Sequence, residues 1–277
     1  MEYLTGYTIK PYEITSLGDV IFTDGTNNDL GANQVTCEAY GYTYDKATGT
    51  CRAFRYNTNL QRNINNINNS LNGTGNTTEL GSNTVQINGT NNTARGFNNN
   101  CSINGSLNEV ANDVNNASVL GGTYGNAIRN SEIVIGGGVA LGVSQTSTVQ
   151  LGGTTTDATA TNLTIQSDGS SLIEVQNNSV FGFEIKVIAL CSGGSSGTAG
   201  DYNYLELIGA VQVDDGYNLA ISQATHTLAK IGSTLHAQVV AVTDPYITVE
   251  VTGLANVSLE WFASVQITEK KLRTGTF

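Results

Sequence analysis

Side chains that could perform acid–base, nucleophilic or metal chemistry are few in this sequence. The two histidines, His226 and His236, offer two nitrogen ligands without a third, so they do not define a metal site. The motifs Gly-x-Ser-x-Gly and His-Glu-x-x-His and the phosphate-binding P-loop are absent. We therefore predict no catalytic residue, no metal ion and no cofactor.

A carbohydrate-degrading site would need two carboxylates about 5–10 Å apart beside a sugar groove. The acidic residues in the middle of the chain do not recur at matched positions of the repeat described below. They are Glu79, Glu109, Asp113, Glu132 and Asp157. The sequence therefore disfavours a glycan-degrading enzyme and keeps it as an alternative.

Recognition of a glycan or a protein is better supported than catalysis. Aromatic faces stack on sugar rings and fill receptor pockets, and loops commonly carry such contacts. For Tyr204 and Trp261, which lie in alternating runs, packing in the core is the favoured alternative. The tyrosines in or near expected loops are the candidate receptor-binding residues: Tyr202, Tyr204, Tyr217 and Tyr246.

Charge and hydropathy exclude several classes of partner. The formal net charge is −11 and the isoelectric point is near 4.5. Nucleic acids and anionic membranes both attract clustered Lys and Arg, so neither is an expected partner. No run approaches the roughly 20 apolar residues of a membrane-spanning helix, and the first residues do not resemble a secretion signal. We expect no membrane insertion.

Four cysteines are present, and they do not form a metal signature. Cys37 and Cys51 flank a turn-rich segment and could form a disulfide across a hairpin. Two buried, reduced thiols fit the same positions equally well. Cys101 occupies a position that other repeat units fill with Val or Ile, and Cys191 follows a strand-like apolar run, so both are expected to be buried hydrophobes.

Glycine recurs mostly every fifteen to seventeen residues through the middle of the chain, after a pair of alternate apolar residues. A repeat of this size predicts a β-solenoid that stacks short strands, here over residues 72–170. The units include Val85-x-Ile87-x-Gly89, Ser118-x-Leu120-x-Gly122, Ile133-x-Ile135-x-Gly137 and Val149-x-Leu151-x-Gly153, with a weaker copy at Leu163-x-Ile165-x-Ser167.

The predicted solenoid has a thin core. Burial of one aliphatic side chain gains about 1.5–3 kcal/mol, whereas ordering the backbone costs about 1–2 kcal/mol per residue. A single chain would therefore be marginally stable. We expect three copies to pack side by side and to share a second apolar face.

A heptad pattern precedes the solenoid, over residues 56–71. Leu60, Ile64, Ile67 and Leu71 are spaced by four, three and four residues, and Ile at both core positions favours three or four strands over two. The intervening residues are mostly asparagines, which are poor helix formers, so the helix would depend on partner chains. A chance spacing within a loop is the alternative.

Strict alternation of apolar and polar residues returns in the last part of the chain, residues 171–277. The runs around Phe183, Leu207, Val249 and Trp261 each predict a strand with one buried face. Several such strands separated by turns fit an antiparallel β-sandwich or jelly roll. Residues 1–55 mix short apolar runs with Gly and Asp turns, and predict a small β-rich domain.

Two resemblances follow from these motifs. The units with Asn83 or Ser131 two positions before the apolar pair resemble the head repeats of trimeric autotransporter adhesins, which form a left-handed β-roll in a homotrimer. The C-terminal segment, from Phe183-Glu-Ile-Lys-Val-Ile through Tyr202-x-Tyr204 to Trp261-x-x-x-Val265-x-Ile267, resembles the terminal β-sandwich of bacteriophage tail fibres.

The resemblances imply an all-β, homotrimeric virion appendage. Residues 1–55 would attach to other tail, baseplate or capsid proteins, and residues 171–277 would bind a glycan or protein of the host surface. The protein would be located on the virion. The alternatives are a purely structural virion component, such as a collar, baseplate or head-decoration fibre, and a bacterial surface adhesin.

Overall fold

The computed structural model describes residues 2–15, 18–46, 48–53 and 68–273. The chain divides into two compact units, Met1–Ile64 and Asn65–Phe277, which are considered separately. The prediction of an all-β fold is confirmed, because the described residues form strands throughout except for one helix of six residues, α1 (Gln34–Ala39). In these ranges no helix is long and apolar enough to cross a membrane.

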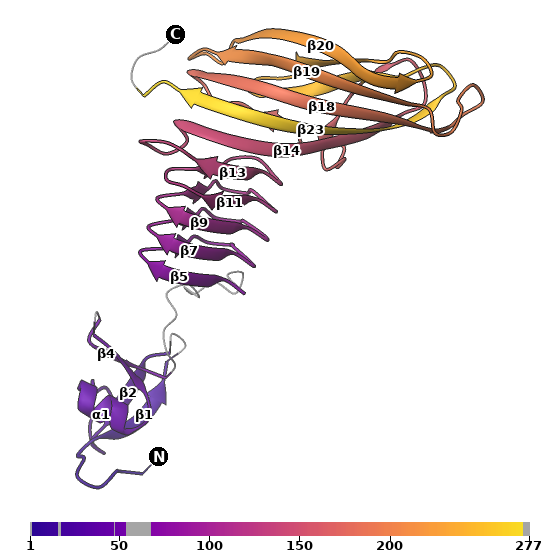
Figure 1. Cartoon of the computed structure of the whole chain (residues 1–277). Helices are drawn as coiled ribbons and strands as arrows, with labels where there is room; N and C mark the ends of the chain where they lie inside the picture. Colours follow the sequence, from indigo (N-terminus) through magenta and orange to yellow (C-terminus); the bar gives the residue numbers. More distant parts are fainter. Residues whose placement is uncertain (1, 16–17, 47, 54–67, 274–277) are drawn as a thin grey trace. The chain divides into compact units, whose positions relative to one another are not determined.

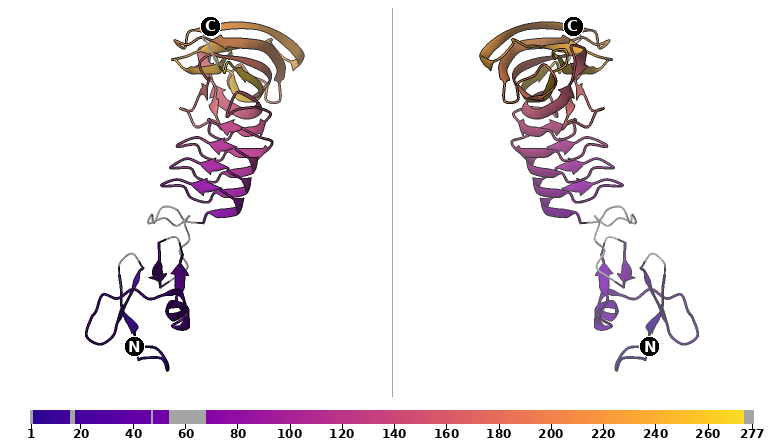
Figure 2. Two further views of the ribbon diagram at one scale, coloured as in Figure 1. Left: turned by 90° about the vertical axis from the view of Figure 1, so that its left-hand side faces the viewer. Right: turned by 90° about the vertical axis from the view of Figure 1, so that its right-hand side faces the viewer.

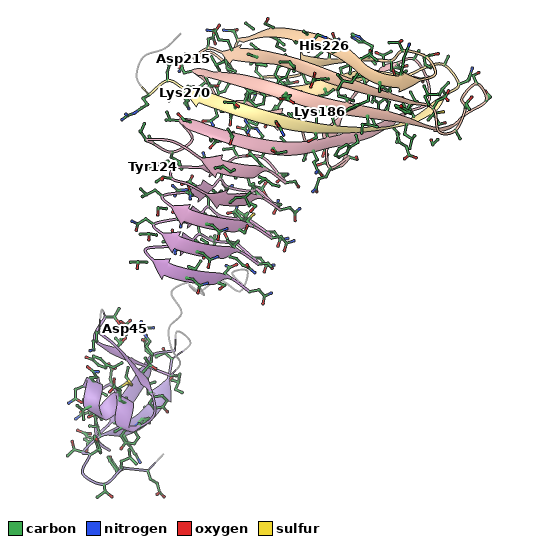
Figure 3. All side chains as sticks on the ribbon, in the orientation of Figure 1. Asp45, Tyr124, Lys186, Asp215, His226 and Lys270 are labelled. Carbon is green, nitrogen blue, oxygen red and sulfur yellow. A yellow bond between two sulfur atoms is a disulfide. The ribbon has the colours of Figure 1, made fainter. Side chains whose placement is uncertain are left out.

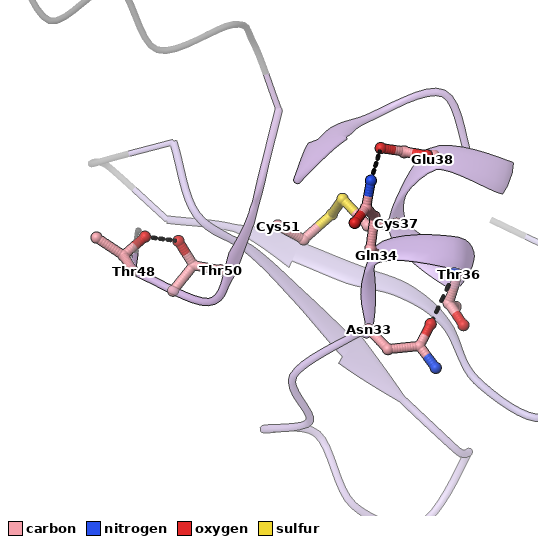
Figure 4. Close-up of a disulfide and its surroundings, with 8 residues drawn as sticks. All are labelled: Asn33, Gln34, Thr36, Cys37, Glu38, Thr48, Thr50 and Cys51. Atoms are coloured by element: carbon pink, nitrogen blue, oxygen red, sulfur yellow. Dashed lines mark hydrogen bonds between the residues drawn. A yellow bond between two sulfur atoms is a disulfide. The ribbon is translucent and has the colours of Figure 1, made fainter. Parts of the chain in front are cut away.

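The first unit is a small β-rich fold held by a disulfide. β1 (Lys10–Ile14) pairs antiparallel with β2 (Val20–Thr23), and β3 (Thr43–Asp45) pairs with β4 (Thr50–Arg52). Helix α1 begins where the side chain of Asn33 accepts a hydrogen bond from the Thr36 N–H at 2.9 Å. A bond of 2.09 Å joins the sulfur atoms of Cys37 and Cys51 (Figure 4), which are buried with Phe22 in this unit's core.

The second unit begins with the predicted β-solenoid, which is confirmed. Figure 1 shows its main strands stacked one above another. All five pair in parallel, and a second column of short strands pairs in parallel on the other side of each coil (Figure 2). The main strands are β5 (Ser70–Thr74), β7 (Gln86–Thr90), β9 (Ser102–Ser106), β11 (Ser118–Gly121) and β13 (Ile133–Gly136); the short ones are β6 (Thr77–Thr78), β8 (Thr93–Ala94), β10 (Glu109–Val110) and β12 (Asn126–Ala127).

The buried apolar column follows a sixteen-residue register that shortens by one residue at the last coil. Ile87, Ile103, Val119 and Val134 occupy this column and are fully buried. The predicted register was wrong in the fourth and fifth units, because the structure buries Val119 and Val134. It leaves the predicted core residues of those units facing solvent: Leu120, Ile133 and Ile135.

Asparagine side chains join successive coils at one corner. Asn92 Nδ2 donates to the carbonyl of Gly105 at 2.8 Å, and Asn92 Oδ1 accepts from the backbone N–H of Asn108 at 3.0 Å. Asn76 and Asn108 make the same two kinds of bond one coil earlier and one coil later. This corner also requires glycine: Gly89 has φ of 127°, and a Cβ there would lie 1.9 Å from the Gly105 oxygen.

The predicted coiled coil falls mostly outside the described residues. Leu60, Ile64 and Ile67 lie there. Leu71, the last member of the pattern, belongs to β5, where it pairs with Ile87 of the next coil and packs against the solenoid core. A helix over residues 56–71 therefore cannot extend to Leu71.

The solenoid stops at β14 (Ser144–Thr155), which pairs antiparallel with β13 on one side and with β23 (Ser258–Lys271) on the other. The repeat units at Val149–Gly153 and Leu163–Ser167 are consequently not further coils. The solenoid therefore ends before residue 170, where the sequence pattern placed its end. Beyond β23 the same sheet continues through long antiparallel strands: β18 (Ser179–Gly193), β19 (Tyr202–Val213) and β20 (Leu219–Ile231).

A second, smaller sheet shares its core with these long strands. In the smaller sheet, β22 (Tyr246–Thr252) pairs antiparallel with three short strands, whose bounds are given below. The short strand β16 (Thr164–Ile165) belongs instead to the long sheet, where it pairs with β14. The common core includes Leu163, Phe181, Leu207, Val249 and Trp261. The neighbours of β22 are β15 (Ala160–Asn162), β17 (Ile173–Glu174) and β21 (His236–Ala241).

Candidate binding surfaces

Five apolar and aromatic side chains form a stripe on the face of the long sheet opposite its core. Alternation places them on this outer face of three neighbouring strands, β23, β18 and β19. Phe262 is opposite Ile188, Ile188 is opposite Tyr204, and Leu190 is opposite Tyr202. Ile188, Leu190 and Phe262 are each 44–45% exposed, and both tyrosines are half-buried. We call Ile188, Leu190, Tyr202, Tyr204 and Phe262 the apolar stripe.

A charged row borders the apolar stripe on the same face. Lys186 Nζ lies 3.2 Å from Glu184 Oε1, and Lys186 is opposite Glu206, which is opposite His226. Figure 3 labels Lys186 on β18 and His226 on β20. The hydrogen bond to Glu184 raises the pKa of the Lys186 ammonium, which therefore stays charged at neutral pH. The surface thus combines exposed rings with solvated charges.

The four predicted tyrosines do not form one site. Tyr202 and Tyr204 lie together on β19, and Tyr204 faces outward rather than into the core. Tyr217 lies in the turn between β19 and β20, at the end of the hairpin opposite Tyr202, and packs partly against the core. Tyr246 begins β22 in the smaller sheet. Trp261 is buried, and its indole N–H donates to Thr155 Oγ1 at 2.9 Å.

A groove of about 390 Å³ lies between the last solenoid corners and the smaller sheet. Glu174 of β17 and Tyr246 of β22 are direct cross-strand neighbours and line one wall. Asn112, Asp113 and Asn130 from the solenoid corners line the other. We call this the junction groove. Burial raises the pKa of the Glu174 carboxyl, the nearby charges of Glu132 and Glu269 raise it further, and Arg129 opposes them.

Arg129, which lines the junction groove, belongs to a buried ion cluster. Arg129 Nη1 lies 2.5 Å from Glu132 Oε1, and Arg129 Nη2 lies 2.7 Å from Glu269 Oε1. Arg129 Nε donates to the carbonyl of Glu174 at 2.6 Å, and Gln145 Nε2 donates to Glu269 Oε2 at 2.9 Å. Burial alone would lower the pKa of the Arg129 guanidinium, but the two carboxylates outweigh it and raise that pKa.

The other acidic residues considered above are engaged elsewhere. Glu79 and Glu109 both pair with Arg95, at 2.6 and 2.9 Å, across neighbouring coils. Asp157 accepts the Thr159 N–H at 2.8 Å within a turn. Asp113 lines the junction groove on the wall opposite Glu174, an acidic residue outside the set that the sequence suggested. Among the described residues, no group of three His, Cys, Asp or Glu side chains is placed to hold a metal ion.

The three aliphatic residues of the solenoid that were predicted to be buried, but face solvent, line a hollow on its surface. Leu120, Ile133 and Ile135 are 45–56% exposed and adjoin polar side chains of β14 and β23, including Thr148 and Gln266. The hollow measures about 310 Å³. Its neighbours on the preceding coils are polar, such as the exposed Asn72–Asn88–Asn104 ladder, so these three residues form a separate apolar patch.

Comparison with known proteins gives weak structural likenesses, among them two phage tailspikes. No protein-family model matches the chain, and no curated protein matches it. The Acinetobacter baumannii phage AM24 tailspike is 7% identical with a TM-score of 0.28, covering 75% of this chain and 50% of that one. The Acinetobacter phage vB_ApiP_P1 tailspike is 8% identical with a TM-score of 0.21, covering 72% and 46%. The chain spans about half the length of these two structures.

Proposed function

We propose that this chain is an attachment fibre protein of a bacteriophage virion, and that its C-terminal part, residues 171–277, contacts the host surface. The apolar stripe carries this proposal. Three of its side chains are 44–45% exposed on a long, hydrogen-bonded sheet. Exposed rings fixed on a rigid scaffold suit stacking on sugar rings or insertion into a receptor pocket.

The rest of the chain fits a support role in this proposal. The solenoid provides a spacer, and the disulfide-bonded first unit provides a separate module for attachment to tail, baseplate or capsid proteins. Three copies in a homotrimer would join three weak surface contacts, and avidity would raise the overall affinity without any new contact. The protein would then be found on the virion, with a host glycan or protein as its partner.

The test uses the full-length protein, fluorescently labelled, with cells of a strain that the parent phage infects. Wild-type protein is expected to label the cells and to compete with infection. A double variant of the apolar stripe, Tyr204→Ala with Phe262→Ser, is expected to lose at least tenfold in binding, because anchor side chains at such surfaces typically contribute about 2 kcal/mol or more. Leu80→Ser, an exposed change on the solenoid, is the matched control.

Two outcomes would reject this function. Wild-type protein that binds no cells would favour the purely structural alternative. Binding that the double variant leaves unchanged would move the contact away from the apolar stripe. Immunogold labelling of virions and of uninfected cells separates the phage component from a bacterial surface adhesin, since an adhesin would label cells that carry no virions.

A further inference from the structure

The junction groove has the side chains of a sugar site, and it is distinct from the apolar stripe. Tyr246 is partly exposed at its mouth and offers a ring face, and its hydroxyl forms no hydrogen bond with any described residue. The half-buried Glu174 carboxylate likewise receives neither a hydrogen bond nor an ion pair within the described ranges. An aromatic ring beside an unpaired carboxylate can bind a ring-shaped ligand that carries N–H and O–H donors.

Asparagines on the opposite wall complete the polar lining. Asn130 Oδ1 is used inside the protein, where it accepts the Asn115 N–H at 2.8 Å, which fixes the orientation of this amide. Asn112 is exposed at the same wall, next to Asp113. The solenoid thus presents its corner as a rigid rim, whereas the smaller sheet provides the ring and the carboxylate.

The charge of the groove selects among sugars. Among the described residues its lining contains one cation, Arg129, and the guanidinium is occupied by Glu132, Glu269 and the carbonyl of Glu174. An acidic sugar would therefore bring its carboxylate next to Glu174 and Asp113 without a free positive charge to receive it. A sugar with an amino group would instead place a cation or an amide N–H against Glu174.

We propose that the junction groove binds a hexosamine unit, free or N-acetylated, of a surface glycan, with Tyr246 stacking on the ring and Glu174 accepting from its nitrogen. This deepens the proposed attachment function and rests on it, but the contact it adds is separate from the apolar stripe. Attachment would then use two regions of one unit, an exposed sheet face and a polar groove.

The experiment measures saturation-transfer NMR of the full-length protein with three probes of related ring structure: galactosamine, N-acetylgalactosamine and galacturonic acid. At about 20 mM, a concentration that fills most of a site whose Kd is about 1 mM, the first two are expected to receive saturation and galacturonic acid is not. Glu174→Gln is expected to weaken galactosamine about tenfold, as for a hydrogen bond to a charged group, and N-acetylgalactosamine less. Tyr246→Ala is expected to weaken both.

Matched controls are Tyr12→Ala, an exposed tyrosine of the first unit, and Glu260→Gln, an exposed glutamate of β23; neither is expected to change binding. Circular dichroism melting checks that each variant is folded. The inference is overturned if galacturonic acid binds as well as galactosamine, if no probe binds, or if both groove variants bind like wild type. If it fails while the Tyr204→Ala, Phe262→Ser variant still loses cell binding, the attachment function stands without the groove.

Discussion

Two asparagine ladders run through the same coils of the solenoid, and they differ in burial. Asn92 is fully buried, and both its donor and its acceptor are used to join coils. Asn88 is exposed, and its side chain bonds to the neighbouring asparagine side chains at 2.9 and 3.1 Å. The asparagine amide is therefore expected to contribute differently to stability at positions 88 and 92.

We predict that Asn92→Ala lowers the free energy of unfolding by about 2–4 kcal/mol, because it leaves the buried Asn108 N–H without this acceptor and removes the side-chain hydrogen bond to the Gly105 carbonyl. Asn88→Ala, the matched control, is expected to cost about 0.5 kcal/mol or less, since water replaces its lost bonds. Urea denaturation followed by circular dichroism measures both. Equal losses in the two variants would show that the buried ladder does not hold the coils together.

Sequence patterns identified some single residues correctly and missed others for a physical reason. The burial of Trp261 follows from alternation along β23. Core packing, the favoured alternative for Tyr204, is wrong, because Tyr204 lies with Tyr202 on the outer side of β19. Glu269 lies two residues after Ile267 and four after Val265, on the side of β23 that faces the core. This position in the alternation could have indicated a buried acid. Its partner Arg129 is 140 residues away, and no local pattern in a single sequence connects two such positions.

At the scale of elements, one buried guanidinium reinforces the contact between the solenoid and the long sheet, which the β13–β14 ladder also makes. Arg129 precedes β13, Gln145 lies on β14 and Glu269 lies on β23, so the ion cluster spans three neighbouring strands. The side chains of Arg129, Glu132 and Glu269 are at most 2% exposed. Removal of the single cation would leave two carboxylates buried without a counter-charge.

We predict that Arg129→Met destabilises the second unit by about 3–5 kcal/mol, as expected for breaking a buried ion pair. Arg95→Met is the matched control: Arg95 also contacts two carboxylates, but its side chain is 45% exposed, so its loss is expected to cost about 1 kcal/mol or less. Thermal and urea unfolding compare the variants. A fully stable Arg129→Met protein would mean that the cluster contributes nothing to holding the two parts together.

The sequence predicts the solenoid correctly, but it predicts less well which residues of each strand face its core. Period and glycine spacing identify a solenoid, because a coil needs one tight corner per turn. The exact register fails at β11 and β13 because Leu120, Ile133 and Ile135 are as apolar as the buried Val119 and Val134. Hydropathy alone cannot choose between two faces of a strand when both carry aliphatic residues. The antiparallel pairing of β14 was hidden for a different reason: Val149 and Leu151 alternate as the coil residues do, and alternation does not reveal the direction of a strand.

At the scale of the whole molecule, the hollow around Leu120, Ile133 and Ile135 supports the proposal of a homotrimer. We predict that the wild-type protein scatters light as a species of about 87 kDa, three times the chain mass of 29.1 kDa. Replacing Leu120 and Ile135 by Ser should shift it toward the monomer, because two exposed aliphatic side chains at an interface each contribute about 1–2 kcal/mol. Leu80→Ser, equally exposed at another coil, should leave the mass unchanged. A monomeric wild type would contradict the prediction.

One sheet runs without interruption from β5 to β20, and this has a mechanical consequence. A pull along the stack of coils acts parallel to the hydrogen bonds between strands, so each ladder bears the tension in series. The ladder between β13 and β14 extends only from Ile133 to Gly136, whereas β14 and β23 are paired along the whole of β14. The β13–β14 ladder is therefore much shorter than the next one, and the Arg129–Glu269 ion pair, which joins the segment before β13 to β23, shares the load across it.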